Sequence, residues 1–292
     1  MPLKKHSMKT NDNPLLSIII VSFNTSKLTV SCINSITRDI ELKNKNIPYE
    51  IVVVDNNSTD DSVKEILNLK FKNLSLIQNK ENLGFSKANN IGIKKVKGEY
   101  VLLLNSDTEI INSSISQCLI WLSSHPTCAC VSSQLLNMDG SIQATGGYFP
   151  NLINTIFWRT HLDDLPLVNN IVKPIHPHTP TFYTKDNFYK NDQVLDWLTG
   201  AFILTRRNIL EKVKGFDESF FMYAEELELQ YRIKKAFPDL YNQYLSGPKT
   251  IHIQGASAKN KSNKYKQEVA GIKKFFEIHK PNQLPFVKPF LN

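Results

Sequence analysis

The chain has few cysteines and no long apolar run. Only Cys32, Cys118, Cys128 and Cys130 occur in its 292 residues, and no two of them form a CxxC pair. A disulfide scaffold and a zinc site with paired cysteine ligands are therefore excluded, and we expect four small buried side chains. The longest apolar run, around 15–21, is much shorter than the roughly 20 residues that a spanning helix needs. No transmembrane helix is expected.

Other common signals are missing as well. The first residues, MPLKKHSMKTNDN, contain no apolar stretch of the kind found in a secretory signal, so a cytoplasmic protein is expected. The chain has no GxGxxG, no GxxxxGK[ST] and no GxSxG motif. These absences argue against a dinucleotide site, a P-loop and an α/β-hydrolase.

The formal net charge of +8 lies at the two ends of the chain. Residues 259–292 hold eight lysines and two glutamates, a net +6, and residues 1–12 add a net +2, so the residues between them are neutral overall. A nucleic-acid partner is not expected, because the body is neutral and the lysine-rich tail has no recognised binding motif.

The basic tail interleaves its lysines with apolar side chains, and two interpretations remain open. One is peripheral contact with an anionic membrane, on the inner face of the plasma membrane. The other is an amphipathic helix that packs its apolar face on the domain. The apolar residues concerned are Ile272, Phe275, Phe276, Phe286, Phe290 and Leu291.

Apolar runs alternate with helical periodicity in the first part of the chain. We expect strands at 17–23, 50–55, 74–78 and 100–105, and helices at 26–38, 60–69, 85–95 and 113–124. Strands that are apolar on both faces and separated by helices are typical of βαβ units. The fold class predicted is α/β with a parallel sheet.

The pattern becomes less regular further along. Five prolines interrupt the segment 149–195, which we expect to be loop with short helices. A strand and helix follow at 196–213, then a helix over 220–237 with an acidic first half. Short strands are expected at 241–245 and 249–255.

Polar residues follow each of the first four predicted strands. They are Ser22 to Asn24, Asp55 to Ser58, the segment 79–85, and Asn105 to Glu109. Ligands of open α/β sheets bind outside the carboxyl ends of the strands. One such end is uninformative, because Asn, Asp and Ser are common in turns, but four in succession predict a binding cleft.

Three further groups are candidates for chemistry. Asn105 and Asp107 offer oxygen ligands that suit Mg²⁺ or Mn²⁺ shared with substrate phosphates, although an exposed turn aspartate is the alternative. The acidic stretch around Glu226 is either a general base beside aromatic residues or a helix start that complements the macrodipole. Spacing puts Glu225, Glu228 and Arg232 on one helical face. His252 is either a metal ligand or a structural hydrogen-bonding group.

Seven segments, in this order, carry a resemblance to a known family: LSIIIVSFN, VVDNNSTDDS, NLGFSKANNIG, LLLNSDTE, DWLTGAFILTRR, GFDESFFMYAEELELQYR and IHIQGAS. Together they resemble the family 2 glycosyltransferases, in the subgroup that includes bacterial rhamnosyltransferases of surface polysaccharides. The resemblance implies a GT-A fold, a Rossmann-like αβα sandwich with a mostly parallel sheet. It divides the chain into a nucleotide-sugar half at 13–110, an acceptor half at 111–258 and the tail at 259–292.

The resemblance also implies an activity. A sugar would move, with inversion, from a nucleoside-diphosphate sugar, dTDP-rhamnose or a UDP-sugar, to a saccharide or lipid-linked acceptor. The alternative is a catalytically impaired sugar-nucleotide-binding subunit of an assembly. Two departures from the family pattern motivate it: Asn105 stands where many members have Asp, and Glu226 replaces Asp, which extends the base by one methylene.

Site residues follow from the resemblance by position. Glu226 is expected to be the catalytic base, with Glu225 beside it, and Asp107 to hold Mg²⁺ or Mn²⁺ together with His252. Trp197, Gly200 and Ala201 would border the acceptor. The nucleotide would contact Ser22, Asn24, Asp55, Asn57, Asn82, Gly84, Phe85, Asn90, Asn105 and Ser106.

Overall fold

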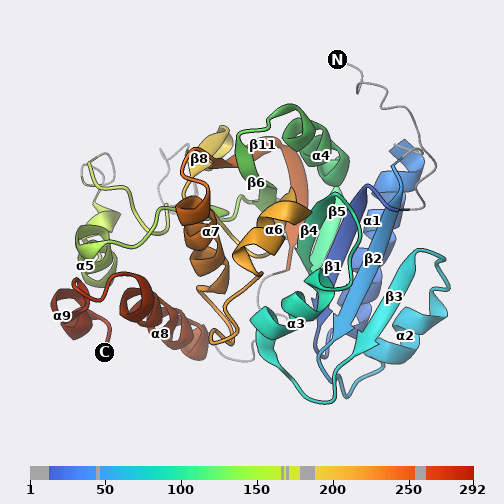
Figure 1. Cartoon of the computed structure of the whole chain (residues 1–292), viewed down its shortest axis with the longest axis horizontal. Helices are drawn as coiled ribbons and strands as arrows, with labels where there is room; N and C mark the ends of the chain where they lie inside the picture. Colours follow the sequence, from blue (N-terminus) through green and yellow to red (C-terminus); the bar gives the residue numbers. More distant parts are fainter. Residues whose placement is uncertain (1–12, 44–46, 166–167, 169–170, 178–187, 254–260) are drawn as a thin grey trace.

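A computed structural model describes residues 13–43, 47–165, 168, 171–177, 188–253 and 261–292. Its first part alternates strands and helices as the periodicity predicts (Figure 1). The elements are β1 (Leu16–Ser22), α1 (Ser26–Lys43), β2 (Tyr49–Asp55), α2 (Ser62–Asn68), β3 (Leu74–Gln78), α3 (Gly84–Ile93) and β4 (Tyr100–Asn105). The strands β3, β2, β1 and β4 lie side by side and run parallel. The predicted α/β class is confirmed.

The second part of the chain extends the same sheet. The order continues from β4 through β10 (Phe202–Arg206), β6 (Cys128–Leu136) and β11 (Tyr241–His252) to β5 (Thr108–Ile111), and β8 (Gln193–Leu195) pairs with β11. The strand β10 runs antiparallel to both of its neighbours, so this part of the sheet is mixed. In the described part of the chain, the two expected halves therefore share one sheet. The strands β5 and β6 were not expected from the sequence.

The remaining elements cover the sheet or extend beyond it. They are α4 (Ser114–Ser124), α5 (Leu152–Thr160), η1 (Leu162–Asp164), η2 (Phe188–Lys190), α6 (Arg207–Val213), α7 (Glu225–Ala236), α8 (Lys261–His279), α9 (Leu284–Val287), η3 (Lys288–Phe290) and the small pair β7 (Gly146–Gly147) and β9 (Trp197–Leu198). Figure 1 shows α5, α8 and α9 together at the end of the molecule opposite β3.

Two expected boundaries were wrong. The acidic helix begins at Glu225 rather than at 220, because Tyr223 and Ala224 adopt positive φ angles of 69° and 66° that a right-handed helix does not allow. The two short strands expected after it form the single strand β11, with a register shift between Leu245 and Lys249. The end of the second expected strand, beyond 253, lies outside the described residues.

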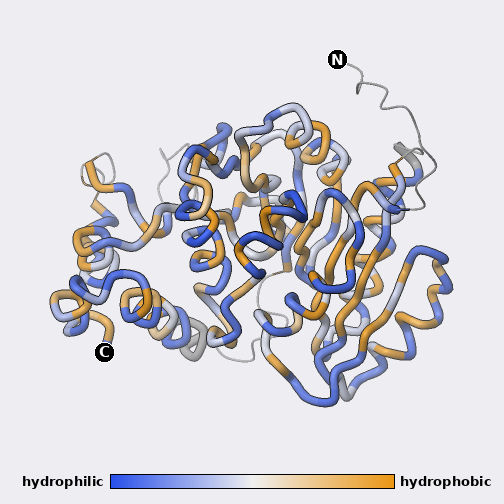
Figure 2. The backbone as a smooth tube through the Cα atoms, in the orientation of Figure 1, coloured by the Kyte–Doolittle hydropathy of each residue, from blue (hydrophilic) through white to orange (hydrophobic). Residues whose placement is uncertain are grey.

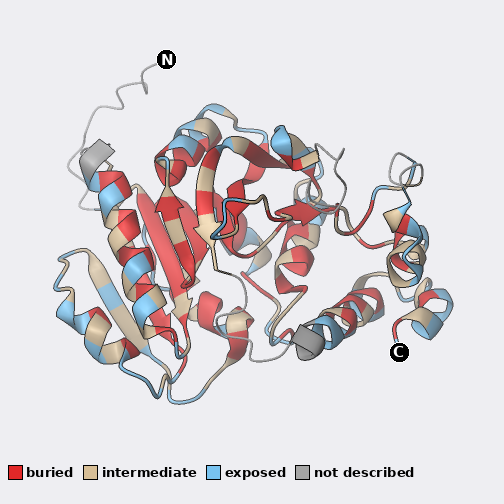
Figure 3. Cartoon of the chain, turned by 180° about the vertical axis from the view of Figure 1, so that it is seen from behind, coloured by how far each residue is buried: buried red, intermediate tan, exposed pale blue. Residues whose placement is uncertain are grey.

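Apolar side chains of the strands point alternately to the two faces of the sheet. In β1, Ile18 and Ile20 join a buried cluster with α1, α2 and α4, whereas Ile19 joins a cluster with α3, α6 and α7. This alternation is the period of two that β-strands impose. Helices therefore cover both faces of the sheet, and its central strands are largely hydrophobic (Figure 2). These strands are also the most buried part of the molecule (Figure 3).

The four cysteines are buried and free, as predicted. Burial raises the pKa of the Cys32 thiol to about 12, so this side chain behaves as a small apolar group. Among the described helices, none combines the length and the apolar composition that crossing a membrane requires.

The apolar face of the basic tail lies against the rest of the protein. Ile272, Phe275 and Phe276 of α8 are buried in one cluster with Leu227 of α7 and Trp197 of β9. The packing interpretation of the tail is therefore confirmed for these three side chains, which are not available to a membrane. Phe286 is different, since 63% of its surface is exposed.

Phe275→Ala should lower the free energy of unfolding by about 3–5 kcal/mol, because truncating a fully buried aromatic side chain leaves a cavity. Urea denaturation measures the change. The matched control is Phe286→Ala in α9, expected to change stability by no more than about 0.5 kcal/mol. Equal effects of the two substitutions would contradict the docking of α8.

Candidate active site

The carboxyl ends of β1 and β2 lie next to each other because the strands pair in register from Leu16 with Tyr49 to Ser22 with Asp55. The Ser22 hydroxyl is buried and forms hydrogen bonds with Thr25 and Thr29. Asp55 Oδ2 accepts a 2.9 Å hydrogen bond from the Ser58 N–H. Its Oδ1 is buried and has no hydrogen-bond partner among the described residues, so it is an acceptor available to a ligand.

Two asparagines at this edge adopt left-handed backbone conformations. Asn24 has φ 53° and Asn57 has φ 66°, a conformation that asparagine tolerates better than most residues. Asn24 Oδ1 accepts a 2.7 Å hydrogen bond from the Thr59 N–H, which ties the ends of β1 and β2 together. Asn57 is exposed at the same edge.

The loop before α3 contacts the segment that leads into α7. Asn82 Oδ1 accepts a hydrogen bond from the Gly84 N–H at 3.0 Å, and the Phe85 N–H donates to the Phe221 carbonyl at 2.9 Å. Gly84 has φ +80°, and a Cβ atom there would lie 2.7 Å from the Phe221 carbonyl oxygen. Glycine is therefore required both for the turn and for this close approach.

Asn90 has a structural partner. Its Nδ2 donates to the Phe216 carbonyl at 2.9 Å and to Glu218 Oε1 at 3.1 Å, and its Oδ1 accepts from the Phe216 N–H at 2.8 Å. Both N–H groups of the amide are thus engaged within the protein. The structure gives Asn90 the role of linking α3 to the segment before α7, and its expected nucleotide contact stays a prediction.

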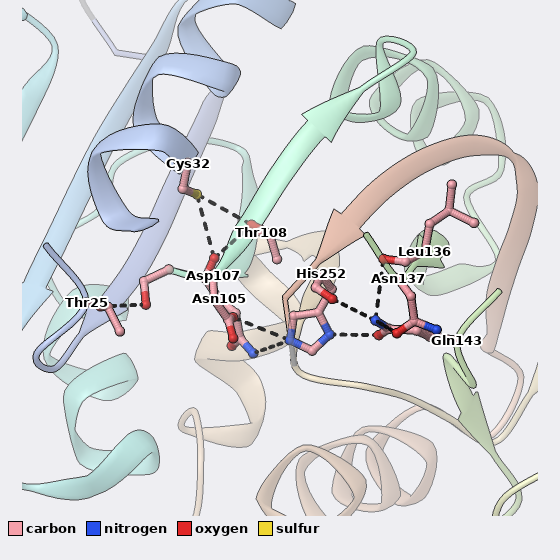
Figure 4. A network of polar contacts seen from close by, with 10 residues as sticks. Thr25, Cys32, Asn105, Asp107, Thr108, Leu136, Asn137, Gln143 and His252 are labelled. Carbon is pink, nitrogen blue, oxygen red and sulfur yellow. Dashed lines mark hydrogen bonds and ion pairs between the residues drawn. The ribbon is translucent and has the colours of Figure 1, made fainter. Parts of the chain in front are cut away.

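The end of β4 and the end of β11 bring a carboxylate and an imidazole together (Figure 4). His252 Nε2 lies 3.4 Å from Asp107 Oδ1 and 3.4 Å from Asn105 Nδ2. The Ile253 N–H also donates to the Asp107 carbonyl at 2.8 Å, which fixes the two strands at this point. Ser106 lies between Asn105 and Asp107 in the sequence, and its hydroxyl lies 3.1 Å from the Thr25 hydroxyl.

Gln143 determines the tautomer of His252. Its Nε2 donates to the His252 carbonyl and to Asn137 Oδ1, each at 2.7 Å, so its Oε1 faces His252 Nδ1 at 3.0 Å. The proton of the neutral ring is therefore assigned to Nδ1, and the lone pair of Nε2 faces both the Asn105 amide N–H and Asp107 Oδ1, each at 3.4 Å. A cation between Nε2 and Asp107 Oδ1 would be a ligand partner for both acceptors.

This donor set fits a divalent cation that also binds substrate. No group of three His, Cys, Asp or Glu side chains suited to a metal occurs within the described ranges. Asp107 and His252 would therefore supply two ligands, and phosphate oxygens and waters would supply the rest. An imidazole ligand favours a transition-metal ion such as Mn²⁺ over Mg²⁺, which prefers oxygen.

The catalytic candidates lie on the first turn of α7. Glu226 Oε1 is 3.4 Å from the Gly200 N–H, and its Oε2 is buried without a hydrogen-bond partner in the described structure. Burial raises the pKa of the Glu226 carboxyl. Glu225 is only 5% exposed, and burial together with the charge of Glu226 raises its pKa well above the ordinary value. The two adjacent carboxyl groups therefore titrate as a pair.

Glu228, on the same turn, has a different role. Its Oε1 accepts hydrogen bonds from Arg232 Nε at 2.7 Å and from His279 Nε2 at 2.9 Å. Burial alone would raise the pKa of Glu228, but these two hydrogen bonds outweigh it and lower the pKa. The Glu228–Arg232 pair expected from the spacing is confirmed within α7, and the contact between Glu228 and His279 ties α7 to α8.

The residues expected to border the acceptor lie beside α7. Gln230 of α7 forms two hydrogen bonds with the backbone of Leu198 in β9. Its Oε1 accepts from the Leu198 N–H at 2.8 Å, and its Nε2 donates to the Leu198 carbonyl at 2.7 Å. Trp197, next to it, is 6% exposed, and its Nε1 has no hydrogen-bond partner in the described chain. The Ala201 carbonyl accepts from the Asn105 N–H at 3.2 Å. A Cβ atom on Gly200 would lie 3.5 Å from the Phe85 ring and 3.8 Å from Glu226 Cβ.

Comparison with known proteins identifies the family. Residues 17–226 match the profile described as "Glycosyl transferase family 2". The chain belongs to this family. The resemblance read from the seven segments is thereby confirmed.

Curated relatives of this family 2 chain include rhamnosyltransferases. One is the N-acetylglucosaminyl-diphospho-decaprenol L-rhamnosyltransferase of Mycobacterium tuberculosis, 27% identical over 202 residues, with 65% of this chain and 62% of the relative covered. This chain thus spans about three fifths of that relative's length. Another is the rhamnosyltransferase WbbL of Escherichia coli, 40% identical over 52 residues, with 18% of this chain and 19% of the relative covered.

Solved structures share the fold. The mannosyltransferase PcManGT of Pyrobaculum calidifontis, in complex with GDP-Man and Mn²⁺, has a TM-score of 0.57 at 15% identity, with 95% of this chain and 74% of that one covered. GalNAc-T7 with UDP, GalNAc and Mn²⁺ has a TM-score of 0.60 at 17% identity, with 92% and 48% covered. The expected GT-A fold is confirmed.

Several residues of the site were not found from the sequence. Gln143 and Gln230 are isolated glutamines without a motif, and only their contacts show what they hold. His176 and Glu268 also lie outside every motif, although the structure places His176 Nε2 2.9 Å from Glu268 Oε1. No local periodicity marks any of the four.

Gln143→Leu should weaken Mn²⁺ binding by about 10- to 100-fold, because the substitution removes the acceptor that holds the His252 tautomer and ring orientation. Calorimetric titration with Mn²⁺ in the presence of dTDP or UDP measures the effect. Gln117→Leu, at an exposed position of α4, is the control and should bind as the unsubstituted protein does. Equal Mn²⁺ affinity in both variants would contradict the role of Gln143.

Proposed function

We propose that this chain transfers a sugar from a nucleoside-diphosphate sugar to an acceptor hydroxyl with inversion at the anomeric carbon. The observation that carries the proposal is that two groups of polar side chains come together near the pairing of β4 with β10. One group is the Asp107–His252 pair, in which Asp107 follows the end of β4 and His252 is the last residue of β11. The other group is the carboxyl of Glu226, whose pKa is raised and which lies beside the Gly200 N–H. Gly200 is next to Ala201, whose carbonyl accepts a hydrogen bond from the Asn105 N–H.

The strand ends on the β1 and β2 side supply the nucleotide site in this proposal. The unpartnered Asp55 Oδ1 accepts a hydrogen bond from the base or ribose, and Phe85 offers an aromatic surface beside Gly200. Asp107 and His252 would hold Mg²⁺ or Mn²⁺, and such an ion would neutralise charge on the leaving diphosphate.

Glu226 acts as general base. It takes the proton of the acceptor hydroxyl, and that oxygen attacks the anomeric carbon from the face opposite the diphosphate. The bond from the anomeric carbon to the phosphate oxygen breaks, and its electron pair leaves with the nucleoside diphosphate. The Gly200 N–H, 3.4 Å from Glu226 Oε1, helps to orient the carboxylate.

The donor class rests on the relatives. Because two of them are named rhamnosyltransferases, we propose dTDP-rhamnose as the donor, with UDP-sugars as the alternative. A saccharide or lipid-linked acceptor in surface polysaccharide biosynthesis fits the same relatives. The competing role, a sugar-nucleotide-binding subunit without catalysis, predicts binding without turnover when a panel of nucleotide sugars is tested with Mn²⁺.

Glu226→Gln should lower the rate of transfer by about 10²- to 10⁴-fold, the usual contribution of a general base, while donor binding is retained. Because the base must be ionised and burial raises its pKa, the rate of the unsubstituted enzyme should rise with pH at values above those typical of an exposed glutamate. Initial rates against pH and calorimetric donor binding measure the two effects.

Glu211→Gln, on the exposed side of α6, is the matched control and should retain full activity. Near-normal transfer by the Glu226 variant would overturn the assignment. If Glu225→Gln were inactive instead, Glu225 would be assigned as the base in place of Glu226.

We also propose that the α5 and α9 end of the molecule contacts an anionic membrane surface, where a lipid-linked acceptor would reside. The Leu152 N–H of α5 donates to Gln283 Oε1, beside α9, at 3.1 Å. Large apolar side chains are exposed in this region, namely Ile153, Leu162, Leu165, Ile171 and Phe286. The net +6 of residues 259–292 supplies the complementary charge.

The double substitution Ile153→Ser with Phe286→Ser should weaken binding to vesicles of anionic phospholipid by at least about tenfold, because two exposed apolar anchors are lost. Vesicle co-sedimentation measures binding. Met138→Ser removes an equally exposed apolar side chain from another surface and should have no effect. Unchanged binding of the double variant would reject the membrane proposal.

A further inference from the structure

The helix α8 lies beyond residues 17–226, which match the family, yet it packs against the start of the catalytic helix α7. We propose that α8 is a positioning element of the catalytic centre, which holds Glu226 through His176 and through the backbone turn that precedes α7. The proposal rests on the role of Glu226 described under Proposed function. Two independent sets of contacts support it.

The first set concerns the turn before α7. Tyr223 and Ala224 are consecutive left-handed residues with side chains, at φ 69° and 66°. Such a conformation persists only where the surrounding structure enforces it. Gly271 of α8 lies directly against this turn, since a Cβ atom there would be 2.7 Å from the Tyr223 carbonyl oxygen and 2.8 Å from Ala224 Cβ. The helix thus holds the turn that aims Glu225 and Glu226.

The second set is a histidine–glutamate pair. His176 Nε2 lies 2.9 Å from Glu268 Oε1 of α8, and its ring makes an edge contact with Trp197 at 5.4 Å between centroids. Burial lowers the pKa of His176, but Glu268 outweighs this effect and the pKa is raised. A charged imidazolium is thereby favoured beside Glu226, whose pKa it lowers.

The charged groups around this pair come from four elements. Glu226 is faced by Glu225 on α7, by Glu268 on α8 and by His176 in the segment 171–177. His176 is also influenced by Asp163 on η1. Glu268 raises the pKa of Glu226 and His176 lowers it, so the two members of the pair act on the proposed base in opposite directions.

Three side chains of this region each carry a buried polar atom that is available to a ligand in this inference. Trp197 Nε1, Glu225 Oε2 and Glu226 Oε2 are buried, and none has a hydrogen-bond partner in the described part of the chain. A donor and two acceptors of this kind suit the hydroxyl groups of a sugar. Because His176 packs on Trp197 and its Nε2 lies 2.9 Å from Glu268 Oε1 of α8, α8 also positions the indole of this site.

Gly271→Ala tests the turn. Alanine favours the helix itself, but its Cβ must displace Tyr223 and Ala224, so kcat should fall by at least about tenfold while Mn²⁺-dependent donor affinity is unchanged. Amide hydrogen exchange of residues 223–226 should become faster, and this readout does not depend on activity. Gly247→Ala is the matched control, because a Cβ atom there meets nothing within 4 Å.

His176→Gln and Glu268→Gln test the pair, also if the Gly271 variant fails to fold. Loss of the imidazolium should move the acid limb of the kcat/KM pH profile of the His176 variant to higher pH, since Glu226 then loses a neighbouring positive charge. His161→Gln, at an exposed histidine that pairs with Asp164, should leave the profile unchanged. Glu268→Gln should lower kcat and speed exchange at 223–226, and Glu268→Asp should restore part of the loss.

The outcomes separate this inference from the proposed function. If Glu226→Gln is inactive but the Gly271, His176 and Glu268 variants match their controls in kcat, pH profile and hydrogen exchange, the positioning role of α8 is overturned and the proposed function stands. If Glu226→Gln remains active, the assignment of Glu226 as the base fails, and the inference that α8 positions this base fails with it. Faster exchange at 223–226 in the Gly271 variant would still support the structural part of the inference.

Discussion

The antiparallel pairing of β4 with β10 is the interaction on which the rest of the site depends. It joins the parallel strands of the first part of the chain to the mixed strands of the second, with Leu104 opposite Phe202. Asn105 then lies against Ala201, and the polar ends of β4 come next to the segment that contacts Glu226. Without this pairing, the residues that follow β4 and those around Gly200 would belong to separate structures.

The first turn of α7 shows how tertiary partners give different chemistry to similar residues. Glu228 accepts hydrogen bonds from Arg232 and His279, so its pKa is lowered and the residue stabilises the packing of α7 on α8. Glu225 and the Oε2 atom of Glu226 are buried without such partners, and the pKa values of both carboxyl groups are raised. One helical turn thus contains both a structural carboxylate and a pair suited to proton transfer.

Much of the architecture could be predicted from the sequence, but not its second half. The β-branched runs of β1, β2 and β4 identify buried parallel strands without any tertiary information. The strand β6, with the sequence CACVSSQLL, lacks such a run although all nine residues are buried, and its partners β10 and β11 lie more than sixty residues further along. The early start expected for α7 was wrong for a related reason, since the left-handed turn at Tyr223 and Ala224 depends on contacts with Gly271.

The sequence by itself determined the alternation of strands and helices, the polar chemistry at the strand ends and the family. These properties depend on residues that are neighbours in the chain or repeat with a helical or strand period. Only the tertiary structure decided the tautomer of His252, the pairing of His176 with Glu268 and the burial of the tail helix. The reason is physical: a proton's position or a carboxyl's pKa depends on burial and on partners from distant segments, such as Gln143 for His252, which no local pattern encodes.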